Sequence, residues 1–182
     1  MNQELEVLKQ VCDRLEQASI SYMITGSVAA SFYAVPRMTR DIDIVIEIEK
    51  ESARNLLKFF KKDFYVDSQA VNEAVKDHGM FNVIHNESVI KIDFIVRKDQ
   101  PYRRAEFKRR RAEEIRGARL WMVSPEDLVL SKLDWAKHSL SSMQLQDVGN
   151  ILSMVKNIDR EYIQKWVKSL HLEEIYRKVQ NG

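Results

Sequence analysis

The chain has 182 residues, of which 45% are hydrophobic and 31% charged, and its formal net charge is only +2. This profile excludes a disordered chain and is typical of a soluble protein with one core, or a core and a small helical appendage. No apolar run approaches the ~20 residues that span a bilayer, the N-terminal sequence has no signal-peptide core, and one cysteine excludes an internal disulfide, so we expect a cytoplasmic protein without membrane contact.

The first half of the chain predicts helices and strands in succession. Apolar residues recur at helical spacing over residues 2–18, which indicates a first helix with Cys12 on its buried side. The strict alternation of DIDIVIEI, residues 41–48, is the pattern of a half-buried strand. The other elements expected here are a strand over 21–25, a helix over 28–34 ended by Pro36, a helix over 50–62, a short edge strand over 64–68, and a hairpin of strands over 80–86 and 88–96.

The pattern changes after Ser124. Residues 102–112 predict a charged helix or arm, and one more strand is expected within 116–124. Ser124 then has the features of a helix N-cap, with Pro125 at the first helical position and Asp127 placed as in a capping box. Helices are expected over 124–139, 143–155, 159–168 and 172–180. We therefore predict an α/β (α+β) domain over residues 1–120, with a small mixed β-sheet flanked by helices, and a C-terminal helical domain over 121–182.

Basic residues are concentrated between Arg97 and Arg119. This segment has ten Lys and Arg residues against four Asp and Glu. The sequence leaves two interpretations equally open: a surface that meets phosphates, or a solvated face whose charges form ordinary salt bridges.

Three carboxylates occupy matching positions on two predicted strands. Side chains two apart in a strand point the same way, so Asp41 and Asp43 share a face, as do Lys91 and Asp93 on the later strand. If the strands are neighbours, the carboxylates converge, and a divalent cation relieves their repulsion. Hard oxygen ligands favour Mg²⁺ or Mn²⁺, and two such ions can activate a hydroxyl and stabilise a leaving pyrophosphate. The alternative is a set of ordinary acidic residues on the wet face of a half-exposed sheet.

Gly26 and Ser27 lie between a predicted strand and a predicted helix. Backbone N–H groups at such a junction can hold phosphate oxygens; Gly26 permits close approach, and Ser27 offers a hydroxyl or a cap. A Gly-Ser pair also makes a simple turn, but its position one helix before Asp41 and Asp43 favours a phosphate site.

The order of these motifs resembles the DNA polymerase beta-like nucleotidyltransferase superfamily. Gly26-Ser27, thirteen further residues and then Asp41-Ile42-Asp43-Ile44 are similar to its hG[GS] and Dh[DE]h signature, and Asp93 matches its third carboxylate. The resemblance implies an enzyme that transfers NMP from an NTP to an acceptor hydroxyl, with the three aspartates as catalytic ligands of two metal ions. Gly26 and Ser27 would bind the nucleotide. The acceptor, which could be RNA or tRNA, a protein or a small molecule, does not follow from the resemblance.

A finer resemblance is to the AbiEii-like, abortive-infection toxin type, branch of this superfamily. Residues 37–43, RMTRDID, are similar to its R-x-T-x-D-h-D pattern, and residues 125–133, PEDLVLSKL, to its P-E-D-L-h-h-x-K-L pattern. This implies that Lys132 is catalytic and contacts the NTP phosphates, that Asp147 supports the lysine or the nucleotide pocket, and that the helical domain completes the nucleotide cleft. The motif residues that would brace the loop or touch phosphate are Arg37, Thr39 and Arg40.

Two further alternatives accompany these implications. Lys132 shares a helix face with apolar residues, where a lysine can simply extend its stem and keep its charge in water. A non-catalytic nucleotide- or RNA-binding protein with the same fold is the alternative to an enzyme. The toxin-type resemblance also implies an antitoxin partner.

Overall fold

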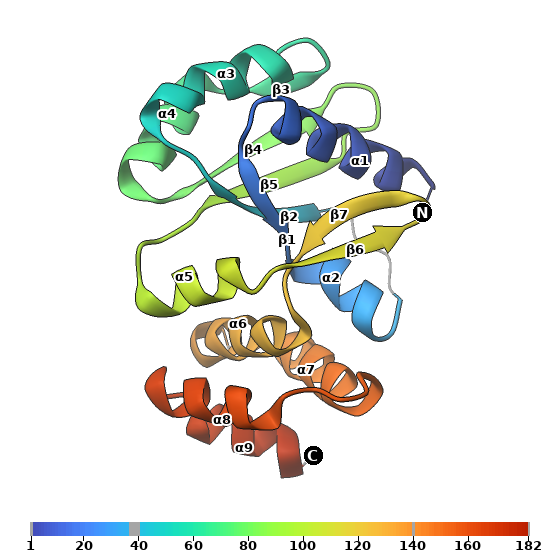
Figure 1. Cartoon of the computed structure of the whole chain (residues 1–182), viewed down its shortest axis with the longest axis vertical. Helices are drawn as coiled ribbons and strands as arrows, with labels where there is room; N and C mark the ends of the chain where they lie inside the picture. Colours follow the sequence, from blue (N-terminus) through green and yellow to red (C-terminus); the bar gives the residue numbers. More distant parts are fainter. Residues whose placement is uncertain (1, 37–40, 140, 182) are drawn as a thin grey trace.

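The computed structural model of the chain describes residues 2–36, 41–139 and 141–181. Within them an α/β part precedes a group of helices, which confirms the predicted fold class (Figure 1). The elements in chain order are α1 (Asn2–Gln17), β1 (Ser21–Ile24), α2 (Gly26–Tyr33), β2 (Asp41–Glu47), α3 (Lys50–Phe60), β3 (Phe64–Val66), α4 (Ser68–Asp77), β4 (Met80–His85), β5 (Lys91–Val96), α5 (Pro101–Lys108), β6 (Arg111–Ile115), β7 (Ala118–Met122), α6 (Pro125–Ser139), α7 (Ser142–Met154), α8 (Arg160–Ser169) and α9 (Glu173–Asn181). None of the described helices has the length and apolar character that crossing a membrane requires.

A mixed sheet forms the centre of the α/β part. Among the described residues it has seven strands in the order β3-β4-β5-β2-β1-β7-β6. β2 is parallel to β5 and antiparallel to β1, and β1 is parallel to β7. The alternating sequence of β2 explains its central place, because Ile42, Ile44 and Ile46 are at most 1% exposed and fill one face. The D-x-D motif therefore lies on an interior strand, with its aspartates on the other face.

Helices cover the isoleucine face of the sheet. Phe60 of α3 packs edge-on against Phe94 of β5, with the ring centroids 5.6 Å apart. α1 contacts α3, β1 and β7, and its Cys12 is buried at 1% exposure, as expected from the helical spacing. α2 contacts β2 from the aspartate side, where Gly26 lies beside Asp43. The aspartate face therefore meets α2 rather than the main apolar core.

Two segments differ from the sequence prediction. No helix is expected over residues 68–77, yet α4 forms there because the Asp67 carboxylate caps it, accepting the Gln69 and Ala70 N–H groups at 2.8 and 3.2 Å. The charged helix or arm expected over 102–112 is a helix that ends at Lys108. Arg111–Ile115 pairs with β7 as strand β6, and the positive φ angles of Arg116 and Gly117, 48° and 80°, suit the two-residue turn between them.

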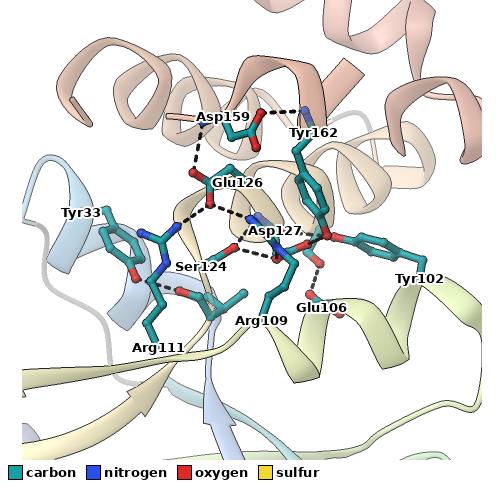
Figure 2. Close-up of polar contacts among 12 residues, drawn as sticks. Tyr33, Tyr102, Glu106, Arg109, Arg111, Ser124, Glu126, Asp127, Asp159 and Tyr162 are labelled. Carbon is teal, nitrogen blue, oxygen red and sulfur yellow. Dashed lines mark hydrogen bonds and ion pairs between the residues drawn. The ribbon is translucent and has the colours of Figure 1, made fainter. Parts of the chain in front are cut away.

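A buried polar network joins the helical region to the rest of the protein (Figure 2). The Asp127 carboxylate is 0% exposed and accepts hydrogen bonds from Ser124 Oγ at 2.6 Å, Arg109 Nε at 3.0 Å and Tyr162 Oη at 2.7 Å. Ser124 also accepts the Asp127 backbone N–H at 3.2 Å, which confirms it as the N-cap. The start of α6 is thus tied to the end of α5 and to α8.

Candidate functional site

Asp43 and Asp93 face each other across two parallel strands. Their Cα atoms are register partners in the β2–β5 pair, and Asp41 and Lys91 are partners two residues earlier. All four side chains lie on one face, because residues two apart in a strand point the same way. Asp93 is 8% exposed, whereas the Asp41 side chain is 57% exposed. The structure therefore brings the three carboxylates to one face, with Asp43 and Asp93 toward the interior and Asp41 toward solvent.

The ammonium group of Lys91 lies between two of these carboxylates. Its Nζ is 2.9 Å from Asp93 Oδ2 and 3.5 Å from Asp41 Oδ1. The hydrogen bond to Asp93 raises the pKa of Lys91 above its ordinary value, so the side chain keeps its charge. The sequence placed Lys91 on this face without indicating a role for it; its spacing of two from Asp93 was the available signal.

Asp43 is held against the N-terminus of α2. The Thr25 N–H donates to the Asp43 carbonyl oxygen at 2.9 Å, and the Ser27 backbone N–H donates to the Asp43 carboxylate. Burial raises the pKa of Asp43 and repulsion from Asp93 adds to the rise, while the Ser27 N–H and the charge of Lys132 oppose it. The Gly26-Ser27 turn therefore positions a carboxylate, a role that the sequence reasoning missed.

Gly26 is required for this close approach. Its φ is +62°, a conformation that favours glycine, and a Cβ atom built on it would lie 1.9 Å from Asp43 Oδ2. The carboxylate thus occupies the space in which any other residue would place its side chain.

Lys132 reaches the site from the helical region. Its Nζ donates to Asp147 Oδ2 at 2.7 Å and to Gln144 Oε1 at 2.9 Å, and the lysine is only 4% exposed. α6 and α7 both contact α2, and the charge of Lys132 acts on Asp43. The structure therefore brings together Lys132 and Asp147, and it adds Gln144, which is three residues before Asp147 on the same helix face.

Arg37, Thr39 and Arg40 lie outside the described residues. The basic segment beyond β5, in contrast, is well described, and most of its arginines form ion pairs. At 2.6–3.4 Å, Arg97 pairs with Glu47 and Asp99, Arg103 with Glu106 and Asp134, Arg104 with Asp99, Arg109 with Glu126 and Asp127, and Arg111 with Glu126. This pattern favours the salt-bridge interpretation of the segment over a phosphate-binding surface.

The donors on the aspartate face suit a divalent cation. Asp43 and Asp93 present carboxylate oxygens from adjacent strands, and their repulsion is the kind that a hard cation relieves. Over residues 2–36, 41–139 and 141–181, no three His, Cys, Asp or Glu side chains are already gathered around one point. Asp41 contacts Lys91 instead, so Asp43 and Asp93 would hold an ion, and Asp41 would join them by leaving the lysine.

The chain is similar to known proteins in its structure, and not detectably in its sequence. No family model and no curated protein matches the sequence. The antibiotic-resistance factor ANT(2'')-Ia is similar over 97% of this chain and 97% of its own, with a TM-score of 0.63 and 11% identity. Its complex with adenylyl-2''-tobramycin gives a TM-score of 0.63 at 13% identity over 94% of this chain and 99% of its own. An antigenic nucleotidyltransferase-like protein from Paracoccidioides brasiliensis gives 0.59 at 18% identity over 96% and 91%. The sheet and the helices after it together have the fold of nucleotidyltransferase-like proteins.

Proposed function

We propose that the chain is a metal-dependent nucleotidyltransferase that moves NMP from an NTP to an acceptor hydroxyl. The observation that carries the proposal is the in-register pair of Asp43 and Asp93 on adjacent parallel strands. Gly26 leaves room for Asp43, and Lys132 brings a buried positive charge to the same site from α6. The likeness to ANT(2'')-Ia over nearly the whole chain supports this chemistry.

In this reaction the acceptor oxygen forms a bond to the α-phosphorus and the bond to pyrophosphate breaks. Asp93 would accept the hydroxyl proton, and Asp43, between Asp93 and the α2 N-terminus, would hold the reacting groups together. Lys132 would stabilise negative charge on the phosphates, because a preorganised cation in a buried site acts strongly on charge that develops in the transition state. Asp41, Asp43 and Asp93 would hold Mg²⁺ or Mn²⁺, two ions in all, which supply Lewis acidity toward the phosphate and the hydroxyl.

The nucleotide would approach from the α2 side of the sheet. The proposed contacts are the α2 N-terminus at Gly26 and Ser27, Lys132 with its partner Asp147, and the loop residues Arg37, Thr39 and Arg40. Asp147 holds the lysine at 2.7 Å, so it would set the direction of the ammonium group rather than bind phosphate.

The acceptor is best sought first among small molecules with hydroxyl groups. ANT(2'')-Ia has been solved with an adenylylated aminoglycoside, adenylyl-2''-tobramycin. An extended RNA surface has less support, since the arginines of the basic segment are engaged in ion pairs. A toxin-like role with an antitoxin partner rests on the AbiEii-like motifs alone.

A labelling screen tests the proposal. The protein is incubated with each α-labelled NTP, Mg²⁺ or Mn²⁺, and a set of acceptors: aminoglycosides, tRNA, a cell lysate and the protein itself. We expect label transfer with pyrophosphate release, abolished by Asp43→Asn and unchanged by Asp77→Asn, an exposed aspartate at the end of α4. Nucleotide binding without pyrophosphate release under every condition would identify a non-catalytic binder, and full activity of Asp43→Asn would exclude this site.

A further inference from the structure

Lys91 differs from the other lysine near the carboxylates in its freedom to move. Its side chain is 39% exposed and contacts Asp93 and Asp41 at the solvent edge of the sheet. Lys132, in contrast, is 4% exposed and held by a carboxylate and an amide. Lys91 can therefore turn into solvent without opening the protein, and Lys132 cannot.

We propose that Lys91 is a positioning residue whose ammonium group holds Asp41 and Asp93 in the metal-free protein and must leave them when a divalent cation binds. The inference rests on the proposed function and deepens it. The geometry follows from the register: Lys91 lies opposite Asp41 and two residues before Asp93, so one ammonium group spans a carboxylate on each strand.

Charge determines what Lys91 does to the site. The three aspartates and Lys91 together carry a formal charge of −2, which a single divalent cation balances, and removal of the lysine leaves −3. The ammonium group therefore stabilises the carboxylates while no metal is bound, and it competes with the metal for the same oxygen atoms. A neutral side chain at this position should lower the stability of the metal-free protein and raise its affinity for the metal.

These opposite effects separate a positioning role from a merely structural one. A residue that only packs the sheet would, when replaced, lower stability and metal affinity together. Replacement of a residue that acts by its charge would lower metal-free stability and raise metal affinity, whereas arginine in its place would keep both at the values of the unaltered protein.

The test is a Mn²⁺ titration of the full chain without nucleotide, followed by electron paramagnetic resonance and calorimetry. We expect Lys91→Met to bind Mn²⁺ about tenfold more tightly than the unaltered protein, because a competing cation a few ångströms away is gone. Lys91→Gln should behave in the same way, which guards against a folding defect of the first variant, and Lys91→Arg should keep the original affinity. Lys58→Met, an exposed lysine of α3, controls for loss of a surface charge.

Thermal unfolding is measured on the same proteins with EDTA and with saturating Mn²⁺. Lys91→Met should unfold at a lower temperature than the unaltered protein in EDTA, and the difference should close or reverse with Mn²⁺. Equal or weaker Mn²⁺ binding by both neutral variants, with nucleotide transfer intact in the unaltered protein, would overturn the Lys91 proposal alone. Absence of Mn²⁺ binding by every protein would overturn it together with the proposed metal dependence.

Discussion

Replacement of Gly26 by alanine tests how closely the fold and the proposed chemistry depend on one contact. Two costs follow from the structure. The backbone φ of +62° disfavours any side chain by about 1–2 kcal/mol. The new methyl group would also lie 1.9 Å from Asp43 Oδ2 and 2.6 Å from its Cγ, so the carboxylate must move. Overpacking of this kind adds a cost of about 1–3 kcal/mol.

Gly117→Ala provides the matched control. Gly117 also has a positive φ, +80°, but nothing lies within 4 Å of the position that a methyl group would take there. It therefore carries the backbone cost without the contact. We expect Gly117→Ala to lower the free energy of unfolding by about 1–2 kcal/mol and Gly26→Ala by about 2–5 kcal/mol. Only Gly26→Ala should reduce nucleotide transfer, by roughly 100-fold, since a displacement of about 1 Å at a reacting group has that effect.

Urea unfolding and the labelling assay measure both quantities. An Asp43→Ala background sharpens the comparison, because it removes the two nearest atoms and leaves only Cβ, at 2.9 Å. The stability cost of Gly26→Ala should then fall by about 1 kcal/mol or more. If Gly26→Ala and Gly117→Ala were equally stable and equally active, Asp43 would not occupy the space above Gly26, and the role given to this glycine would be refuted.

Two further predictions concern buried charges. Lys132→Met should lower the free energy of unfolding by about 3–5 kcal/mol, because it leaves the Asp147 carboxylate buried without its counter-ion. A second change, Asp147→Leu, should restore most of the loss. If the single variant were as stable in urea as the unaltered protein, this prediction would be contradicted. Burial raises the pKa of Glu106 above its ordinary 4.5, so the folded protein holds that proton more tightly than the unfolded chain. Stability should accordingly fall as pH rises from 4.5 through the raised pKa, and Glu106→Gln should flatten this slope in pH-dependent unfolding; an unchanged slope would show that Glu106 does not contribute to it.

The sequence predicted best where one periodic signal dominates. The alternation in β2 indicated the strand and the face of its aspartates, and the Ser124–Pro125 start indicated α6. Prediction failed at residues 68–77, where the Asp67 cap stabilises the helix, and at residues 111–115, where a charged strand pairs with β7 at the edge of the sheet that the described residues form. Such an edge strand buries little apolar surface, so its sequence lacks the hydrophobic alternation that would predict a strand.

In the candidate site, too, the sequence indicates some features and leaves others to the three-dimensional structure. Asp43 and Asp93 could be named from spacing and resemblance, because strand period and motif order are properties of the chain alone. The bridge made by Lys91 and the amide contact of Gln144 could not, since both depend on which strands and helices become neighbours. The position of Gly26 under Asp43 likewise appears only when the two segments are placed together.

A buried acidic pair anchors the start of α6, the helix that carries Lys132. Glu126 and Asp127 accept bonds from Arg109 and from α8, which fixes the first turn of α6 against both parts of the protein. Lys132 follows Asp127 on the same helix, only about 7.5 Å further along its axis. A rigid helix anchored at its first turn transmits little displacement over that distance. These contacts of the first turn of α6 therefore help to position Lys132 relative to Asp43. We infer that the segment from Pro125 to Leu133 has two roles: its first turn fixes the helix, and its lysine provides the positive charge.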